Sequence, residues 1–488
     1  MAKKIHPYVY IILTFVGVIL IGTLLLSMPF ATTSNHSIGF IDALFTATSA
    51  TCVTGLTVRN IASELSLFGK IVMIVLMEVG GLSFITITVF FFTIGGARIG
   101  ISNRFLLREA LNQSSVEGLV SLVRKIVLIS FTIQLIFVFI NWFPFFQFLE
   151  YEIGEGQDGL RSIGLLGSDY NNSFKLSYSF FLSLFHAAAS FNNAGFDVIS
   201  PNSLIIINST STVIPFSSIV LLNSTTMAMI VLGSLGFVVY DDVVRKRFKW
   251  NYFSLHTKIV LITTLILIVF GAAFIWLSAN FAKSGDTQHM NFMEALFTSI
   301  TCRTAGFATY DMSMLEFLPI TYIICIFLML IGASPCSTGG GVKTTTLAVT
   351  AIAIYYYARG KKATCFKRRI DQSQTAKAFV LLVVAILIVF FGTILVLCIQ
   401  PELGFDKVLF EIVSAFSTTG LSMGITSSLN AINRIIVVII MFFGRLGPLT
   451  IMGVLNKNWM SNAIEDVQYV KENVMIGWER KRIRTILS

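Results

Sequence analysis

Charged residues are scarce in this 488-residue chain, at 12% of the sequence, whereas an average soluble domain carries roughly 25%. Hydrophobic residues make up 55% of the chain, 44 residues are phenylalanine, and the mean hydropathy is +0.81. A soluble chain of this length would form about three domains. The composition excludes that organisation and instead predicts a chain that lies mostly within a lipid bilayer.

Cysteine and histidine are also few and scattered. The six cysteines form no Cys-x-x-Cys pair and no metal-binding spacing with histidine, which excludes a disulfide framework and a structural metal site. The five histidines are dispersed along the sequence. A membrane enzyme would need acids, bases or nucleophiles clustered at membrane depth. We therefore expect no catalytic residues and no cofactor bound by this chain.

Long apolar runs divide the chain into predicted membrane spans. Lys3 and Lys4 precede an apolar run from about Tyr8 to Pro29, which is long enough to cross a bilayer of ~30 Å and which we expect to be retained. Further spans are predicted near 68–93, 127–149, 214–240, 257–280, 317–358 (interrupted), 376–399 and 433–455. The predicted fold class is an all-α integral membrane protein with eight full spans.

The net charge of +10 is placed unevenly and predicts the orientation of the spans. Basic runs at 245–249, 359–369 and 480–484 fall on the same side as Lys3 and Lys4, whereas the opposite loops are acidic, as at 150–158. By the positive-inside rule, both termini are cytoplasmic in a multi-pass protein of the cell membrane, with lipid as an immediate partner. Because topology explains the basic charge, we expect no nucleic-acid binding.

Four short polar turns that end on glycine lie between apolar segments, each after a short stretch with a helical pattern. They are Val53-Thr54-Gly55, Asn193-Ala194-Gly195, Thr304-Ala305-Gly306 and Thr418-Thr419-Gly420. The tetrapeptide Ala-Leu-Phe-Thr occurs at equivalent places, 43–46 and 295–298, which indicates internal repetition. We expect four span–pore-helix–span repeats around one pseudo-fourfold pore. The repeats are 1–100, 101–250 with cytoplasmic and outer insertions, 251–360 with a broken last span, and 361–460, followed by a cytoplasmic tail at 461–488.

The chemistry of these turns favours a monovalent cation. Glycine tolerates positive φ, so successive carbonyl groups can point inward instead of pairing along a helix. Irregular backbone at membrane depth survives only where it is buried in protein or lines water. A ring of carbonyl oxygens can replace the hydration shell of an ion, and no ring of Asp or Glu suited to a divalent ion lies in the turns. A role in packing alone could explain one such turn but not four at equivalent places.

A glycine-rich interruption lies in the last span of the third repeat, at 332–346. Pro335 and the run Gly339, Gly340 and Gly341 cannot hold a regular helix. We expect this segment, which includes Lys343, to form a loop that acts as a gate. The loop would lie directly below the ring of carbonyl oxygens from the four turns, which we call the filter. Because Val342 rather than glycine precedes Lys343, the segment does not match a phosphate-binding loop.

Two charged residues lie within predicted spans, where a charge is costly and usually faces a cavity. Arg445 lies in the last span, and the apolar run continues from Leu446 to Leu455. We expect Arg445 to line the pore and to belong to the gate. The other is Glu78, for which the sequence names no partner.

These residues together resemble the Trk/Ktr/HKT superfamily of potassium transporters, over nearly the whole chain from about residue 8 to 455. The segments that carry the resemblance are 51–56, 191–196, 303–307, 339–346 and 444–450. The resemblance implies one filter glycine per repeat, an intramembrane gating loop, and an arginine that faces this loop, which matches Arg445. Some plant members carry serine in place of the first glycine and prefer sodium, so Gly55 points to potassium.

The chain lacks the two extra N-terminal spans of the Trk branch and is most similar to the bacterial Ktr-type membrane subunit. This resemblance implies a homodimer and a cytosolic ring of nucleotide-binding regulatory subunits. A sodium-preferring or sodium-coupled transporter of the same fold, with sodium as a possible activator, is the alternative, and the sequence does not separate channel-like flow from ion-coupled uptake. An adaptor protein would give no reason for four filter-like turns.

Overall fold

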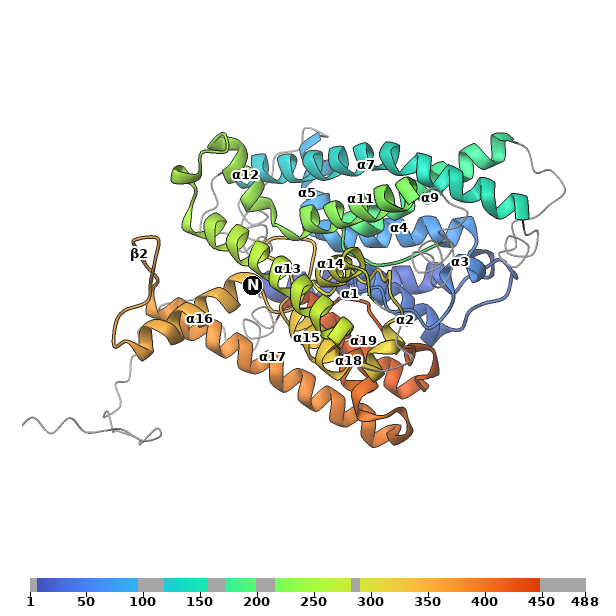
Figure 1. The fold of residues 1–488 in the computed structure, drawn as a ribbon. Helices are drawn as coiled ribbons and strands as arrows, with labels where there is room; N and C mark the ends of the chain where they lie inside the picture. The colour runs from blue at the N-terminus through green and yellow to red at the C-terminus, as the bar shows by residue number, and fades with distance from the viewer. Residues whose placement is uncertain (1–6, 95–117, 156–171, 199–215, 282–289, 448–488) are drawn as a thin grey trace, which may run out of the picture.

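The computed structural model describes residues 7–94, 118–155, 172–198, 216–281 and 290–447, and these ranges are mostly helical (Figure 1). The helices are α1 (Pro7–Leu26), α2 (Phe40–Thr51), α3 (Ile61–Glu64), α4 (Leu67–Leu82), α5 (Phe84–Ile94), α7 (Leu119–Glu155), α9 (Asn172–Phe191), α11 (Phe216–Ser234), α12 (Phe237–Arg245), α13 (Leu255–Phe281), α14 (Phe292–Thr301), α15 (Pro319–Leu330), α16 (Thr344–Ala358), α17 (Gln372–Ile399), α18 (Phe405–Ser417) and α19 (Ala431–Leu446). Strands β1 (Thr364–Cys365) and β2 (Arg368–Arg369) form one antiparallel hairpin.

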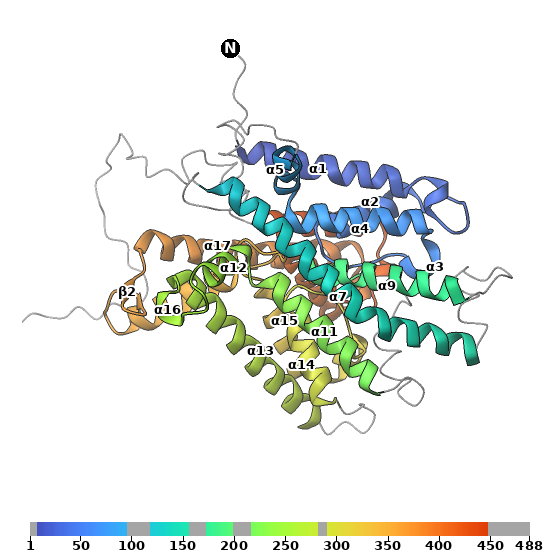
Figure 2. The same ribbon diagram turned by 90° about the horizontal axis from the view of Figure 1, so that it is seen from above.

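The long helices run broadly along a common direction, with α12, α16 and the hairpin at one end and α3 at the other (Figures 1 and 2). In the described part of the chain, α1, α7, α13 and α17 are each long and apolar enough to cross a membrane, and the bent pair α11–α12 would make a fifth. Large apolar side chains such as Leu20, Phe270 and Phe390 are exposed on their outer faces. Helices that are apolar on the outside as well as the inside are typical of a bilayer environment.

Two of the predicted spans are broken in the structure. The predicted span near 68–93 consists of α4 and α5, separated at Ser83, whose φ is +70°. The predicted span near 214–240 consists of α11 and α12, which are bent by 89° at a break next to Gly236. The sequence reasoning missed both breaks because each apolar run continues through them.

The predicted last span near 433–455 is described only in its first part. Helix α19 ends at Leu446, one residue after Arg445, and Gly447 has φ of +78°. Arg445 therefore lies in the last turn of this helix. Residues 448–455 of the predicted span lie outside the described residues.

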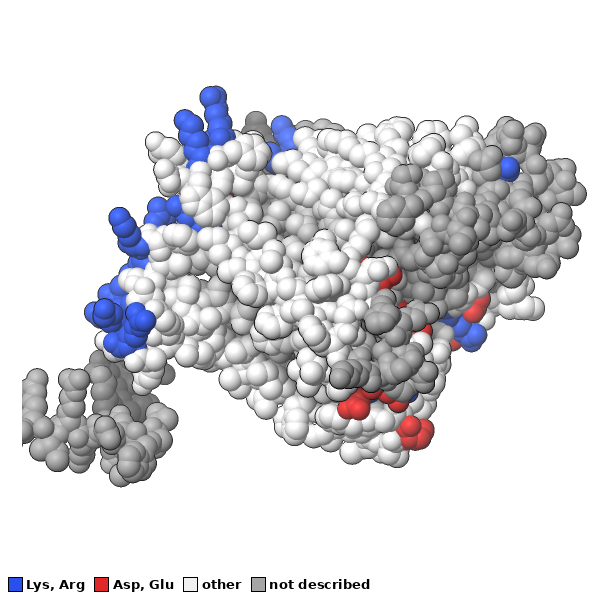
Figure 3. Space-filling model, viewed as in Figure 1, with Lys and Arg blue, Asp and Glu red and all other residues white. Residues whose placement is uncertain are grey.

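The two ends of the molecule carry opposite charge. Lys and Arg gather at the end with α12 and the hairpin, and most of the visible Asp and Glu lie near the other end (Figure 3). At the basic end, Asp241 pairs with Lys125 at 3.0 Å and with Arg245 at 2.8 Å, which joins α12 to α7. Asp242 accepts hydrogen bonds from the Thr257 hydroxyl at 2.7 Å and from the N–H of Ser254 at 2.9 Å, which joins α12 to the start of α13.

Candidate functional site

The four glycine turns each follow the C-terminus of a helix and share one backbone conformation. Helices α2, α9, α14 and α18 end one to three residues before the turns. Two residues before each glycine the backbone is left-handed, at Val53 (φ +56°), Asn193 (+59°), Thr304 (+76°) and Thr418 (+53°). The glycines follow with φ of +95° (Gly55), +66° (Gly195), +88° (Gly306) and +90° (Gly420). Positive φ is uncommon for residues other than glycine. A left-handed residue followed two positions later by a positive-φ glycine therefore marks all four turns as one recurring conformation.

The amide groups of the turns bond back to their own helices. The N–H of Thr54 donates to the carbonyl of Ser49 at 2.8 Å, and that of Thr419 donates to Ser414 at 2.9 Å. The second turn repeats this bond from Ala194 to Ala189 at 2.7 Å. In the third turn the bond spans one residue fewer, from Ala305 to Thr301 at 2.9 Å. These bonds use the donors and leave the carbonyl oxygens of the turns for another partner.

The four turns contact each other in a closed cycle. A Cβ added to Gly55 would lie 2.5 Å from the carbonyl oxygen of Ala194, which is too close for any side chain. The other three pairs are closer still, namely Gly195 with Ala305, Gly306 with Thr419, and Gly420 with Thr54. Each glycine therefore packs against the carbonyl group that precedes the next glycine. Among the described residues, none of these four carbonyl oxygens accepts a hydrogen bond.

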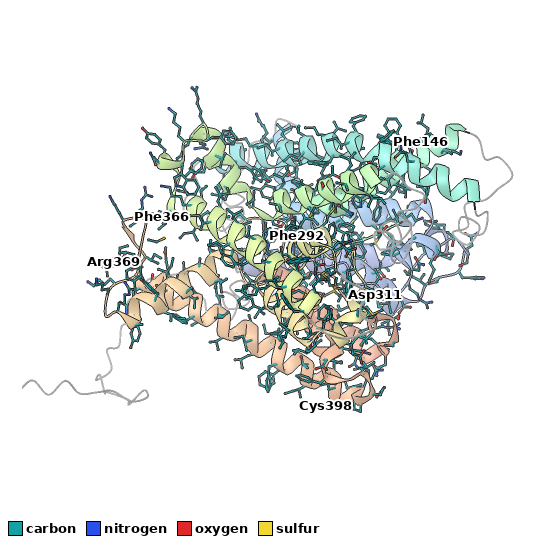
Figure 4. The ribbon with its side chains drawn as sticks, in the orientation of Figure 1. Phe146, Phe292, Asp311, Phe366, Arg369 and Cys398 are labelled. Carbon is teal, nitrogen blue, oxygen red and sulfur yellow. The ribbon has the colours of Figure 1, made fainter. Side chains whose placement is uncertain are left out.

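A cavity of about 260 Å³ lies directly against the four glycines. Its wall also includes Arg59, Asn60, Asp197, Asp311 and Ser422. Figure 4 labels Asp311 at the end of the molecule opposite Phe366 and Arg369. We call this cavity the vestibule, and it lies on the side of the turns away from the basic hairpin.

The segment 331–343 between α15 and α16 folds as a loop against the turns. Ile331 and Val342 pair at its base, where the N–H of Gly332 donates to the carbonyl of Val342 at 2.8 Å. The N–H of Gly340 donates to the Thr418 hydroxyl at 3.1 Å. A Cβ on Gly339 would collide with the Thr304 hydroxyl. The glycine run thus lets the loop approach the third and fourth turns as closely as backbone allows.

Polar groups hold this loop in place. The Thr338 hydroxyl lies between the carbonyls of Phe191 at 3.2 Å and Gly233 at 3.1 Å. The Lys343 ammonium donates to the carbonyl of Gly339 at 2.7 Å. The loop is therefore tied to the second repeat as well as to itself.

Arg445 joins this loop to α4. Its guanidinium donates to the carbonyls of Thr338, Gly80 and Gly81, the last at 3.2 Å. Gly80 and Gly81 lie in the last turn of α4. Within the described part of the chain, no carboxylate forms an ion pair with Arg445. One arginine therefore bridges the loop and α4 through carbonyl oxygens alone.

Three glycines that the sequence reasoning missed position the helices behind the turns. A Cβ on Gly80 would overlap the carbonyl of Thr51, and the equivalent overlaps are Gly233 with Phe191 and Gly444 with Phe416. Each glycine lies three residues before the positive-φ residue that follows its helix, at Ser83, Gly236 and Gly447. The sequence feature that could have identified these glycines is their recurring position, as in Gly80-Gly81-Leu82-Ser83 and Gly444-Arg445-Leu446-Gly447.

Buried polar side chains surround the turns. The side chain of Glu78 lies near those of Asn192 and Gln134, so its neighbours belong to the turn after α9 and to α7. Cys52 and Cys302 are fully buried and follow the last residues of α2 and α14. Arg303, beside Thr304, is only 1% exposed, and the sequence reasoning assigned it no place in the site.

A helical bundle with apolar outer faces, in which four equivalent turns present unbonded carbonyl oxygens, belongs to the class of membrane transport proteins. The family model described as TrkH, cation transport protein, matches residues 3–465, and the chain belongs to this family.

The relatives that this chain matches are named as uptake proteins. It is 34% identical to Ktr system potassium uptake protein D of Bacillus subtilis (strain 168), over 97% of this chain and 98% of that protein. Ktr system potassium uptake protein B of the same organism is 36% identical, over 94% of each chain. The potassium/sodium uptake protein NtpJ of Enterococcus hirae is 32% identical, over 97% of this chain and 98% of that one.

The fold is similar to a solved structure. The crystal structure of the potassium transporter TrkH from Vibrio parahaemolyticus matches with a TM-score of 0.68 at 14% identity, covering 94% of this chain and 86% of that one. The all-helical membrane transporter fold and the predicted family are thereby confirmed. The family consists of transporters rather than enzymes, as the sequence predicted.

Proposed function

We propose that this protein is the potassium-translocating membrane subunit of a Ktr-type uptake system, and that its four glycine turns form the cation filter. The observation that carries the proposal is the closed cycle in which each glycine packs against the carbonyl preceding the next one. A dehydrated cation at the centre would meet the carbonyl groups of Thr54, Ala194, Ala305 and Thr419 from four directions. These oxygens replace its lost water, and potassium is the substrate held there.

The helix order supports four repeats with eight spans. Each repeat combines a long apolar helix, a helix that ends at a glycine turn, and a second apolar helix that is interrupted or ends near a positive-φ residue. These triplets are α1, α2 and α4; α7, α9 and α11; α13, α14 and α15–α16; and α17, α18 and α19. They correspond to the repeats 1–100, 101–250, 251–360 and 361–460, with the tail at 461–488 outside the described residues.

The loop 331–343 is the proposed gate. It lies against the turns on the side opposite the vestibule, where it touches Thr304 and Thr418. Gly339, Gly340 and Gly341 permit this close approach, while Lys343 and Arg445 donate to loop carbonyls. Because Arg445 also donates to α4, breaking its bonds would free the loop to leave the pathway. Its unpaired positive charge beside the pathway also opposes the passage of a cation.

The charge distribution supports cytoplasmic termini and a cytosolic partner. Ile11 near the start of α1 packs with Leu119 and Val123 near the start of α7, at the end that carries the basic residues (Figure 3). By the positive-inside rule this end faces the cytoplasm of a cell membrane. The names of the relatives place those proteins in a Ktr system. From the resemblance to Ktr-type membrane subunits we infer a homodimer that assembles on a ring of nucleotide-binding regulatory subunits.

A sodium-preferring or sodium-coupled transporter of the same fold is the second candidate, because one relative is named as a potassium/sodium uptake protein. Rubidium uptake by a host that lacks its own potassium uptake systems separates the two. We expect saturable uptake that excess sodium does not inhibit competitively, with sodium at most an activator. Uptake of sodium in preference to rubidium would instead establish the second candidate, and no uptake of either ion would contradict both.

A further inference from the structure

The Asp42 carboxylate on α2 receives two arginines from different parts of the chain. Arg59 Nε donates to Asp42 Oδ2 at 2.8 Å. Arg434, at the start of α19, donates through Nη1 to Asp42 Oδ1 and through Nη2 to the carbonyl of Ser427 at 3.1 Å. Asp42 itself is 7% exposed, so the pairs form at a partly dehydrated site. The charge of this carboxylate is therefore shared between two guanidinium groups.

Arg59 differs from Arg434 in where it lies. It follows the first filter glycine by four residues, lines the vestibule, and has a half-exposed side chain. Among the described residues that line the vestibule, Arg59 is the only basic one, whereas Asp197 and Asp311 are acidic. Arg434 does not line the vestibule. A positive charge therefore stands in the wall through which a cation would approach the four glycines.

An unmasked charge at this place would reduce the local concentration of cations, because a charged wall acts on ions at the mouth of a cleft. The geometry prevents this in two ways. The Nε bond turns the Arg59 guanidinium toward α2, and Nη1 lies 3.9 Å from a carboxylate oxygen of Glu64. Both acids lie beside the guanidinium and compensate its charge.

We propose that Asp42 masks Arg59 and thereby sets the affinity with which the vestibule admits its cation. This inference rests on the proposed cation pathway and adds to it a control at the outer entrance, separate from the gate. Asp42 also joins α2 of the first repeat to α19 of the fourth repeat. These two repeats are not consecutive in the sequence. The Asp42 carboxylate thus links the first and fourth repeats and also sets the charge at the entrance to the vestibule.

The test is the KM for rubidium uptake at low ionic strength, in a sucrose-balanced buffer, and again with added choline chloride. Arg59→Gln removes the charge and should lower KM, whereas Asp42→Asn unmasks it and should raise KM, each by about twofold to fivefold. In the double variant Asp42→Asn/Arg59→Gln, KM should return to or below the wild-type value. Added salt should shrink all these differences, since it screens exposed charges. If the substitutions acted only by disturbing the structure, the double variant would not restore KM, and added salt would not reduce the differences in KM.

The matched control is Lys407→Gln, which removes an exposed ion pair with Glu316 (2.9 Å) that does not line the vestibule. Its KM should stay at the wild-type value. If Asp42→Asn does not reach the membrane, Arg59→Gln decides alone, because its half-exposed side chain tolerates replacement. An unchanged KM for Arg59→Gln at low ionic strength, or a change that persists at high salt, overturns the masking role. Absence of rubidium uptake by the wild-type protein would instead refute the proposed function.

Discussion

Gly55, Gly195, Gly306 and Gly420 differ from Gly17, Gly39 and Gly404 in what lies beside them. Gly17, Gly39 and Gly404 have open space where a side chain would be, whereas the four turn glycines face a carbonyl group of the next turn. Their positive φ adds a second reason for glycine, since L-residues are strained there. Two independent constraints therefore act on each of these residues.

Arg445 is the other residue whose surroundings define its role. Arg445→Ala would leave the carbonyls of Thr338 and Gly80 without a donor and would remove a positive charge from the pathway. We expect faster rubidium uptake and weaker control by a cytosolic partner. We also expect a lower melting temperature in detergent, because each orphaned buried carbonyl costs about 1–3 kcal/mol.

Arg445→Lys is the control for this prediction. It keeps the charge but loses the fork that reaches two carbonyls at once, so it should give an intermediate rate. Rates are normalised to the protein present in the membrane. An Arg445→Ala protein that is folded and transports no faster than wild type would exclude a barrier role for this side chain.

At the scale of elements, the second helix of each repeat is broken or ends close to the turns. The breaks at Ser83 and Gly236, the loop after Leu330, and the end of α19 at Leu446 lie at corresponding places. Glycines just before three of these points allow the helix to contact the carbonyl end of the helix that precedes a turn. The breaks therefore help these helices to pack behind the four glycine turns.

Gly444→Ala tests this packing. The new methyl group would overlap the carbonyl of Phe416, so α18 or α19 must shift. We expect a loss of stability of ~1–3 kcal/mol, seen as a lower melting temperature in detergent. Gly17→Ala, where nothing lies within 4 Å, should leave the melting temperature unchanged or slightly higher. Equal effects of the two substitutions would contradict the packing role.

Deletion of residues 339–341 tests the loop as an element. The shortened loop could no longer reach Thr304 and Thr418 while its base stays paired between Ile331 and Val342. We expect a higher uptake rate and weaker regulation, measured as rubidium flux with and without the regulatory subunit. A deletion protein that reaches the membrane and transports at the wild-type rate under unchanged regulation would show that the loop is not the barrier.

At the scale of the whole molecule, the basic end is the surface to which we propose that a cytosolic partner binds. Arg245 and Lys246 are paired with Asp241 and Asp242, whereas Arg368 and Arg369 in the hairpin are exposed. Replacing Arg368 and Arg369 by glutamine should weaken co-purification of the proposed regulatory ring at low salt, and the difference from wild type should shrink as salt screens the exposed charges. Arg245→Gln, next to its own acid, is the matched control. Binding that is equal for all variants at every salt concentration would leave these residues only a topological role.

The parts of the fold that could be predicted from the sequence are those with a local residue signature. The four turns and the loop 331–343 require glycine at fixed places, so their positions were visible in the chain. The break at Ser83 was not, because a serine with positive φ leaves no such mark. The pair Asp42–Arg434 joins residues 392 positions apart, and the contacts of Arg445 and Glu78 likewise depend on packing between repeats. The assignment of the four turns to a filter, and of the loop 331–343 and Arg445 to a gate, stays a prediction.

The measurement that tests the central claim most directly is the rubidium-to-sodium preference of Gly55→Ser, compared with Gly17→Ser. The serine side chain would enter the space of the Ala194 carbonyl and strain a backbone with φ of +95°. We expect the preference for rubidium over sodium to fall by on the order of tenfold, about 1.4 kcal/mol of discrimination, while Gly17→Ser keeps the wild-type preference. A Gly55→Ser protein that is present in the membrane, transports, and discriminates as well as wild type would contradict the assignment of the glycine ring as the filter.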